Sequence, residues 1–232
     1  MTDSLIIPRR FNGPPDSGNG GYVTGRLAVR LAGPQGVAEG VTVVLRNPIP
    51  LDAPLQVTVS EGRLRLQEGE RLLAEAMPGE VEAAPIPPVP YETAVAATAG
   101  YPGRSGDTPF AQCFVCGPAR TDGLGLAPGP VGEHTVATPW TPGASPEPGP
   151  EIVGAALDCP GGWATDLLTR PSLLGTMTVR VVAVPEAGER CVVLGRLLRR
   201  EGRKTFTAST AYGEDGRLLG QADQIWIELS SG

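Results

Sequence analysis

Four short landmarks occur twice in this chain of 232 residues, and they come in the same order in each half. They are Gly20-Gly21-Tyr22, Val41-Thr42-Val43, Glu61-Gly62-Arg63 and RLLAEA (71–76), matched by Gly161-Gly162-Trp163, Met177-Thr178-Val179, Glu201-Gly202-Arg203 and RLLGQA (217–222). Matching segments in a fixed order indicate an internal repeat. We therefore expect two copies of one unit, and the chain is long enough for each copy to bury a core.

Each copy reads as one helix followed by antiparallel strands. Apolar residues recur at helical spacing after both Gly-Gly pairs, in the sets Val23, Leu27, Leu31 and Trp163, Ala164, Leu167, Leu168. Alternating stretches that run into proline, VTVVLRNPIP (41–50) and MTVRVVAVP (177–185), predict strands. The opening strands are expected in SLIIPRRF (4–11) and EHTVATPW (133–140). One helix on an antiparallel sheet makes each copy an α+β unit.

The repeat divides the chain into three segments. We expect a first unit over 1–84, a connection over 85–132 and a second unit over 133–232. The connection is rich in proline, alanine and glycine, has no clear periodicity and contains the CxxC sequence AQCFVCGPAR. It is expected to be a linker that wraps over the surface.

The charge and the hydropathy of the chain limit the kinds of partner that it is expected to bind. The formal charge of −6 and the pI near 4.9 argue against a nucleic-acid surface. No stretch approaches the ~20 apolar residues of a membrane span, and the first residues lack the apolar core of a signal peptide. We therefore expect a cytoplasmic protein that binds neither nucleic acid nor membrane.

The cysteines predict no disulfide framework, because four cysteines are too few and cytoplasmic thiols stay reduced. Cys113 and Cys116 form a lone CxxC, whereas a structural zinc site needs four ligands. The only further candidates are Cys159, Cys191 and His134. We expect no metal. No phosphate-binding loop and no nucleophile elbow occurs either, so no cofactor is expected.

The Gly-Gly pairs have two interpretations. A helix N-terminus carries about half a positive charge and unpaired N–H groups, so glycines there let a substrate carbonyl approach. On this interpretation Asn19, Gly20, Gly21 and Tyr22, together with Gly161, Gly162 and Trp163, bind substrate. The alternative is that Asn19 and Asp158 cap their helices, that the glycines permit close packing, and that the aromatic residues lie in the core.

Three stretches carry a family resemblance. GNGGYVTGRLAVRLA (18–32), VTVVLRNPIPLDAPLQVTVSEGR (41–63) and RLLAEA resemble the first half of the double-hotdog acyl-CoA thioesterases. AALDCPGGWATDLL (155–168) through GRLLGQADQIWIEL (216–229) resembles the second half. The resemblance implies two tandem hotdog units, each a long helix wrapped by a curved antiparallel sheet.

The resemblance also implies a catalytic set. In such thioesterases an aspartate, a threonine and a glutamine position the water that attacks the thioester. The matching residues are Asp158, Gln224 and, as the nearest threonine, Thr176, with Thr178 close by. A carboxylate can activate water while a hydroxyl and an amide hold it. The structural alternatives are a helix cap, a residue of high β-propensity and an exposed strand side chain, respectively.

Three functions follow from these residues. The first is hydrolysis of an acyl-CoA or related acyl thioester, with the carbonyl bound by the Gly162 and Trp163 amides. The second is a non-catalytic module that binds an acyl-CoA or acyl ligand. The third, dehydration, would use an Asp-His pair, and His134 is remote from any aspartate of the motif. The two joined units would replace the dimer of single-hotdog chains, and we expect such subunits to be able to form a homodimer.

Overall fold

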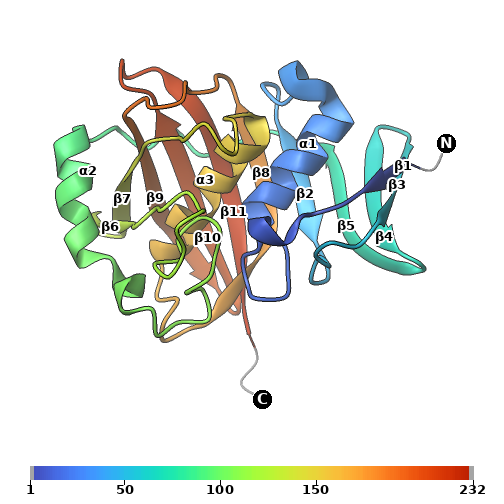
Figure 1. Ribbon diagram of the computed structural model, residues 1–232, viewed down its shortest axis with the longest axis horizontal. Helices are drawn as coiled ribbons and strands as arrows, with labels where there is room; N and C mark the ends of the chain where they lie inside the picture. Colours follow the sequence, from blue (N-terminus) through green and yellow to red (C-terminus); the bar gives the residue numbers. More distant parts are fainter. Residues whose placement is uncertain (1–2, 230–232) are drawn as a thin grey trace.

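The computed structural model of the protein describes residues 3–229 and contains one antiparallel sheet of 11 strands (Figure 1). The strands are β1 (Asp3–Leu5), β2 (Val41–Leu45), β3 (Leu55–Ser60), β4 (Arg63–Glu68), β5 (Arg71–Pro78), β6 (Gly129–Gly132), β7 (Thr135–Trp140), β8 (Ser172–Val181), β9 (Cys191–Glu201), β10 (Lys204–Tyr212) and β11 (Leu218–Glu228). The helices are α1 (Gly20–Gly36), α2 (Tyr91–Ala97) and α3 (Pro150–Trp163), with short 3-10 turns at Arg9–Phe11, Thr98–Gly100 and Pro102–Ser105. This is the α+β composition that the sequence predicts.

The strand order is nearly symmetric about its central pair, and only the edge strand β6 has no counterpart in the other half. It runs β1-β3-β4-β5-β2-β8-β11-β10-β9-β7-β6, with β2 and β8 paired in the middle. Across this central pair the hydroxyl oxygens of Thr42 and Thr178 are hydrogen-bonded at 2.8 Å. Three of the four repeated landmarks lie at matching places in this order: in β2 and β8, in the β3–β4 and β9–β10 turns, and at the starts of β5 and β11.

Helix α1 begins where the sequence predicts it. Asn19 is the N-cap, with extended backbone, and its side-chain oxygen accepts a hydrogen bond from the N–H of Tyr22. Leu27 of the predicted apolar face is fully buried. The regular helix is interrupted at Gly33, whose φ of 74° glycine adopts without steric cost.

The prediction for the second long helix is wrong, because Gly161-Gly162-Trp163 end this helix instead of beginning it. Helix α3 begins at Pro150, follows the N-cap Gly149, and ends at Trp163, while 164–170 form turns and bends. Its side chains are buried almost all round, and the apolar burial outweighs the low helix propensity of proline and glycine. The first landmark pair of the repeat is therefore wrong, since one member starts α1 and the other ends α3.

Glycines allow α1 and α3 to pack closely. A Cβ on Gly21 would lie 2.5 Å from the Cβ of Asp158, and a Cβ on Gly25 would lie 2.5 Å from the Cα of Glu151. Real side chains do not tolerate such distances, so backbone meets backbone at this contact. The packing brings the first turn of α1 against the middle of α3.

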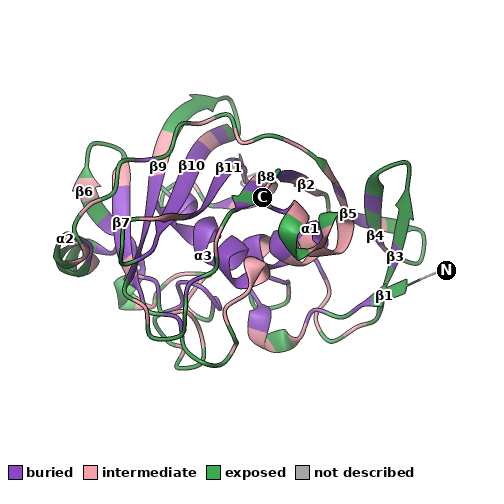
Figure 2. Ribbon diagram, turned by 90° about the horizontal axis from the view of Figure 1, so that it is seen from above, coloured by how far each residue is buried: buried purple, intermediate pink, exposed green. Residues whose placement is uncertain are grey.

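Burial is concentrated between the sheet and these two helices (Figure 2). On β8, Met177 and Val179 point into this core, and α3 lies between α1 and strands β9, β10 and β11. Among residues 3–229, no helix has both the length and the apolar character that a membrane crossing requires.

The segment 85–132, expected as a surface linker, is packed into the fold and includes α2 and the edge strand β6. The Ile86 N–H donates to the Thr210 hydroxyl, and the Tyr212 hydroxyl donates to the Ile86 carbonyl. A loop over 106–128 then covers the junction of α1 and α3, where Phe114 is fully buried. Its side chains thus form part of the core and of the site described next.

Candidate functional site

Asp158 lies in α3, yet its carboxylate is bound by the first turn of α1. Its Oδ2 accepts a hydrogen bond of 2.7 Å from the Asn19 side-chain amide and one of 3.0 Å from the Gly21 N–H. The residue is 3% exposed. The alternative in which Asp158 caps its own helix is therefore wrong, whereas Asn19 does cap α1.

The second carboxylate oxygen of Asp158 is free. Oδ1 is buried and makes no hydrogen bond to any part of the chain that the structure describes. Burial raises the pKa of this carboxyl to about 7, because the charged form loses its water, while the Gly21 N–H and the Asn19 amide partly oppose the shift. A buried carboxyl with one oxygen fixed and one available has the geometry of a group that accepts a proton from a bound molecule.

The first turn of α1 also contributes a free donor. The N–H groups of Gly21 and Tyr22 are used by Asp158 and Asn19, whereas the Gly20 N–H donates to none of the described residues. Gly20 lines the same pocket as Asp158. The positive end of the α1 dipole and this N–H can therefore hold a partly negative oxygen.

A pocket of about 530 Å³ opens in front of Asp158. Its polar groups come from Asn19, Asp158, the loop over 13–18 and the neighbouring residues Arg46 and Asn47. Apolar side chains form much of the rest, among them Leu45, Ile49, Phe110, Leu174 and Trp226. The pocket thus joins a carboxylate and a helix N-terminus to a hydrophobic surface, as small-molecule sites commonly do.

The predicted oxyanion donors of the second half are not at a helix N-terminus. Gly162 and Trp163 belong to the last turn of α3, whose dipole end is negative, so their amides are not placed to bind a carbonyl oxygen. Gly161 and Gly162 serve close packing instead, because a Cβ on either would collide with Gln224 or Trp226. The Trp163 ring does line the pocket.

Tyr22 lies in the core, which is the structural alternative to substrate binding for this residue. Its ring stacks on Phe11 with centroids 3.9 Å apart, and Phe114 packs edge-on against both rings. Tyr22 is buried, does not line the pocket and accepts a hydrogen bond from Arg26 on its hydroxyl. It anchors the first turn of α1 to the covering loop.

Thr176 is not brought to Asp158. It lies on β8 opposite Val44 and Ile225, one position before Met177, whose side chain is in the core. Because successive strand side chains point to opposite faces, Thr176 faces away from α3. It does not line the pocket.

Gln224 is close to α3 but is occupied in holding it. Its Nε2 donates to the carbonyls of Leu157 and Asp158, both at 2.9 Å, and its Oε1 accepts from Thr207 and Ser209. The residue is 1% exposed, so the structural alternative of an exposed strand side chain is wrong. Gln224 contacts the backbone of Asp158 and not its carboxylate.

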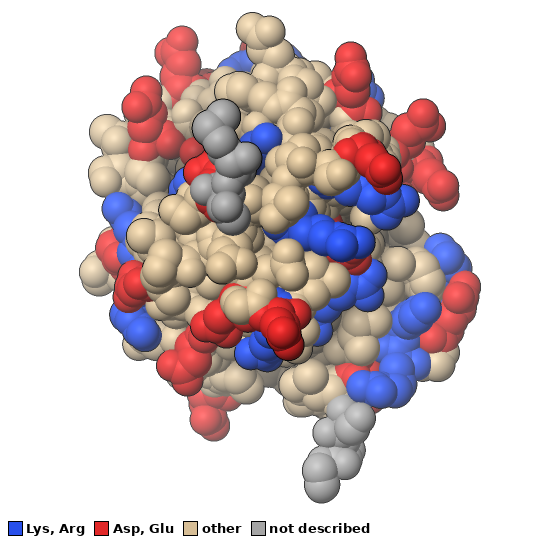
Figure 3. All heavy atoms as spheres, turned by 90° about the vertical axis from the view of Figure 1, so that its right-hand side faces the viewer, with Lys and Arg blue, Asp and Glu red and all other residues tan. Residues whose placement is uncertain are grey.

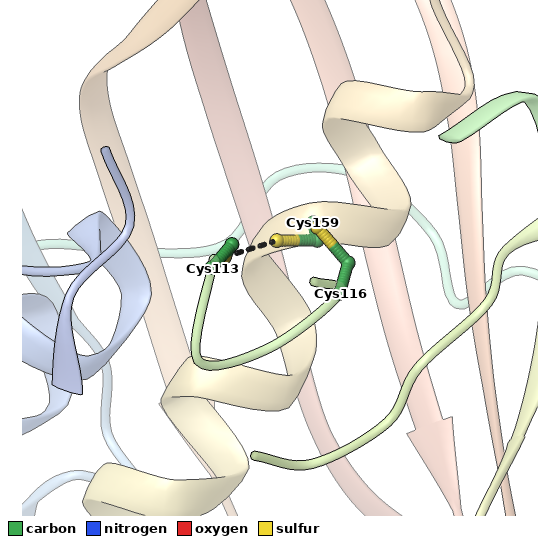
Figure 4. A group of neighbouring side chains, drawn as sticks. All are labelled: Cys113, Cys116 and Cys159. Carbon is green, nitrogen blue, oxygen red and sulfur yellow. Dashed lines mark hydrogen bonds between the residues drawn. The ribbon is translucent and has the colours of Figure 1, made fainter. Parts of the chain in front are cut away.

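Three cysteines form a buried cluster beside Asp158 that the sequence did not predict (Figure 4). Cys113 and Cys116 come from the covering loop and Cys159 comes from α3, and their sulfur atoms all lie within 4.8 Å of one another. All three line the pocket. The other candidate ligands lie elsewhere, with Cys191 on β9 and His134 in the β6–β7 turn.

Charges alternate on the face of the molecule that Figure 3 shows, at the β1–β3–β4 end of the sheet. Glu75 forms ion pairs with Arg46 at 2.5 Å and with Arg65 at 3.6 Å. Acidic and basic side chains are interspersed over this face, so their fields largely cancel one another locally.

Comparisons of sequence identify no relative: no protein-family model matches the chain, and no curated protein matches it. Comparison of structure does find similar proteins. A proposed thioesterase from Novosphingobium aromaticivorans DSM 12444 matches with a TM-score of 0.66 and 15% identity, over 98% of this chain and 95% of that chain.

Two further solved structures are similar over nearly their whole length. A proposed thioesterase II from Thermobifida fusca YX matches with a TM-score of 0.63 and 14% identity, over 98% of this chain and 92% of that chain. A conserved protein of unknown function with a hot dog fold from Alicyclobacillus acidocaldarius matches with a TM-score of 0.62 and 14% identity, over 100% of this chain and 93% of that chain. At such identities the likeness describes the fold, and the protein has a hotdog fold.

Proposed function

We propose that this protein is a thioesterase-like hydrolase that acts on an acyl-CoA or a related acyl thioester. We further propose that it is a double hotdog, in which 1–84 and 133–232 are tandem units and the inserted 85–132 covers the site. The matching order of strands on the two sides of β2 and β8, apart from the edge strand β6, and one long helix in each half support this division. The names of the similar structures agree with the activity.

The observation that carries the proposal is the joint position of Asp158 and the first turn of α1. One half of the chain contributes Asn19 and Gly21, and the other half contributes the carboxylate that they bind. Gly20 lies between these two donors and lines the same pocket. The apolar part of the pocket would hold an acyl chain, with Leu174 and Trp226 along its wall.

The chemistry uses water as the nucleophile. A water bound to the free Oδ1 of Asp158 gives up a proton to the carboxylate as its oxygen attacks the thioester carbonyl carbon. The Gly20 N–H and the α1 dipole stabilise the negative oxygen of the tetrahedral intermediate. The carbon–sulfur bond then breaks, and the leaving thiolate takes the proton that Asp158 accepted, which leaves a carboxylic acid and a free thiol and restores the Asp158 carboxylate. Gln224 acts here as a positioning residue that fixes α3.

The second candidate, a module that binds an acyl ligand without turnover, has one observation in its favour. Thr176 faces away from Asp158, and Gln224 is held by α3, β10 and β11. The Thr176 hydroxyl and the Gln224 amide, which were expected to hold the water, are thus not directed at the Asp158 carboxylate.

One experiment separates the two candidates. A panel of acyl-CoAs with different chain lengths is incubated with the protein, and release of free thiol is measured. We expect turnover with at least one substrate, and Asp158→Asn to lower kcat by about 10²–10⁴-fold, because an amide cannot accept the proton. The matched control is Asp223→Asn, since Asp223 also accepts backbone N–H groups, from Glu82 and Ala83, but lies outside the pocket.

The outcomes are distinct. Thiol release that is equal in the wild type and in Asp158→Asn removes Asp158 from the mechanism. Saturable acyl-CoA binding, measured by calorimetry, without any thiol release would instead establish the binding module. Equal loss in both variants would indicate general damage, which thermal unfolding detects.

A further inference from the structure

The three sulfur atoms of the cluster have the spacing of a metal site. The Sγ atoms of Cys113 and Cys159 are 3.8 Å apart. Two zinc–sulfur bonds of about 2.3 Å at a tetrahedral angle separate their sulfurs by about 3.8 Å. The Cys116 sulfur lies within 4.8 Å of both, so small side-chain rotations would bring all three around one ion.

Hydrogen-bond donors point at two of these sulfur atoms. The Val115 N–H is directed at Cys113 Sγ at 3.4 Å, inside the CxxC turn, and the Trp163 indole N–H is directed at Cys116 Sγ at 3.3 Å. The Asn19 amide is 3.9 Å from Cys113 Sγ. Donors in the shell around the ligands stabilise thiolates and orient them for a metal.

The cluster also brings together two segments that are separate in the sequence. Cys113 and Cys116 lie in the loop over 106–128, which has little regular structure, and Cys159 lies in α3. All three residues are buried and none forms a disulfide. A metal bound by these three residues would crosslink the covering loop to the helix that carries Asp158.

The fourth coordination position would open toward the pocket. All three cysteines line the pocket, and Asp158 lies outside the group of mutually close ligand atoms. Three thiolates favour Zn²⁺ over hard cations, and three protein ligands with one exchangeable position are typical of zinc centres that bind water or substrate.

We propose that Cys113, Cys116 and Cys159 bind one Zn²⁺ ion whose fourth position is open to the pocket. The proposal goes beyond thioester hydrolysis and does not rest on it, because zinc content is measured without any substrate. It differs from the expectation from sequence, which was that the chain binds no metal.

The test uses the full chain, purified under a non-chelating reductant. Zinc per chain is measured by mass spectrometry, the affinity is measured by competition with a chromogenic chelator, and Co²⁺ replaces Zn²⁺ for absorption spectroscopy. We expect one zinc per chain and a sulfur-to-cobalt charge-transfer band. Cys116→Ser should weaken binding by about 100-fold or more, and Trp163→Phe, which keeps all three thiols, by about 10-fold or more.

The matched control is Cys191→Ser, because Cys191 is the fourth buried cysteine and lies on β9 away from the cluster. This variant should keep full zinc content. Less than about a tenth of an equivalent in the reconstituted wild type, with no charge-transfer band, overturns the proposal. Equal zinc binding by the wild type, Cys116→Ser and Cys159→Ser also overturns it, because the metal then binds elsewhere. Thermal unfolding of each variant verifies that it is folded.

Discussion

The side-chain amide of Asn19, at the start of α1, donates a hydrogen bond of 2.7 Å to the carboxylate of Asp158, 139 positions later in the chain. The same side chain accepts from the Tyr22 N–H with its oxygen. Asn19 thus caps one helix and orients the Asp158 carboxylate of the other. These two roles can be separated by substitution.

Asn19→Ser should keep the cap and lose the contact with Asp158, because serine caps helices well but has no amide to donate. We expect near-native stability and a fall in kcat/KM for thioester hydrolysis of about 10–100-fold, the usual effect of losing one hydrogen bond to a charged group. Asn19→Ala should show the same fall and an added loss of about 1 kcal/mol in the free energy of unfolding. Equal activity of wild type and Asn19→Ser would show that the contact is dispensable.

The substitution Gln224→Met should lower the stability of the folded protein. Four groups, the carbonyls of Leu157 and Asp158 and the hydroxyls of Thr207 and Ser209, lose their buried partner. We expect a loss of about 2–4 kcal/mol in urea unfolding, because unpaired buried polar groups are costly. Gln56→Met, at an exposed position of β3, is the control and should change little. A fall in kcat with unchanged stability would instead indicate direct contact of Gln224 with the reacting water.

Leu174→Trp should shorten the acyl chain that the pocket accepts. Leu174 lines the pocket, and a Cβ on Gly20 would lie 2.7 Å from its side chain, so added bulk has no room to move toward α1. We expect kcat/KM to fall more for long-chain than for short-chain acyl-CoAs. Leu198→Trp, at an exposed position of β9, should leave the preference unchanged. An identical chain-length profile for both variants would place the acyl chain elsewhere.

Stability should depend on pH through Glu189. The Arg217 guanidinium bonds both of its carboxylate oxygens at 2.7 Å and lowers its pKa. A carboxyl whose pKa is lower in the folded state stabilises the protein above its unfolded pKa, and this contribution is lost as pH falls through the folded pKa. Urea midpoints between about pH 3 and 6 should therefore fall less steeply in Glu189→Gln than in the wild type. The exposed Glu70 provides the control, and Glu70→Gln should follow the wild-type curve.

Sequence reasoning predicted the elements that periodicity and turns determine locally. The strands around the Glu61 and Glu201 turns and the α1 start at Asn19 are examples. It misplaced α3, because Pro160 and the following glycines read as a helix start, whereas burial on all sides lets the helix pass through them. Local propensity was overridden there by tertiary packing.

The site was only partly predictable for a related reason. Asp158 was identified as a candidate, but its partner at the α1 start depends on a close helix–helix contact that no spacing reveals. The approach of Cys159 to the Cys113-Cys116 pair depends on the path of an irregular loop, which has no periodicity to read. The one local signal for the site was Asp158 next to Cys159, because it is the one charged residue between Ile152 and Trp163.

The start of α3 differs from that of α1 in the polar groups that it offers to a ligand. Its N-cap, Gly149, has no side chain, and Pro150 has no N–H, so this end lacks the counterparts of the Asn19 amide and of the Gly20 N–H at α1. We therefore expect a stoichiometry of one acyl ligand per chain, not one per helix. Natural variation should accordingly be tolerated far more freely around Pro150 than around Gly20.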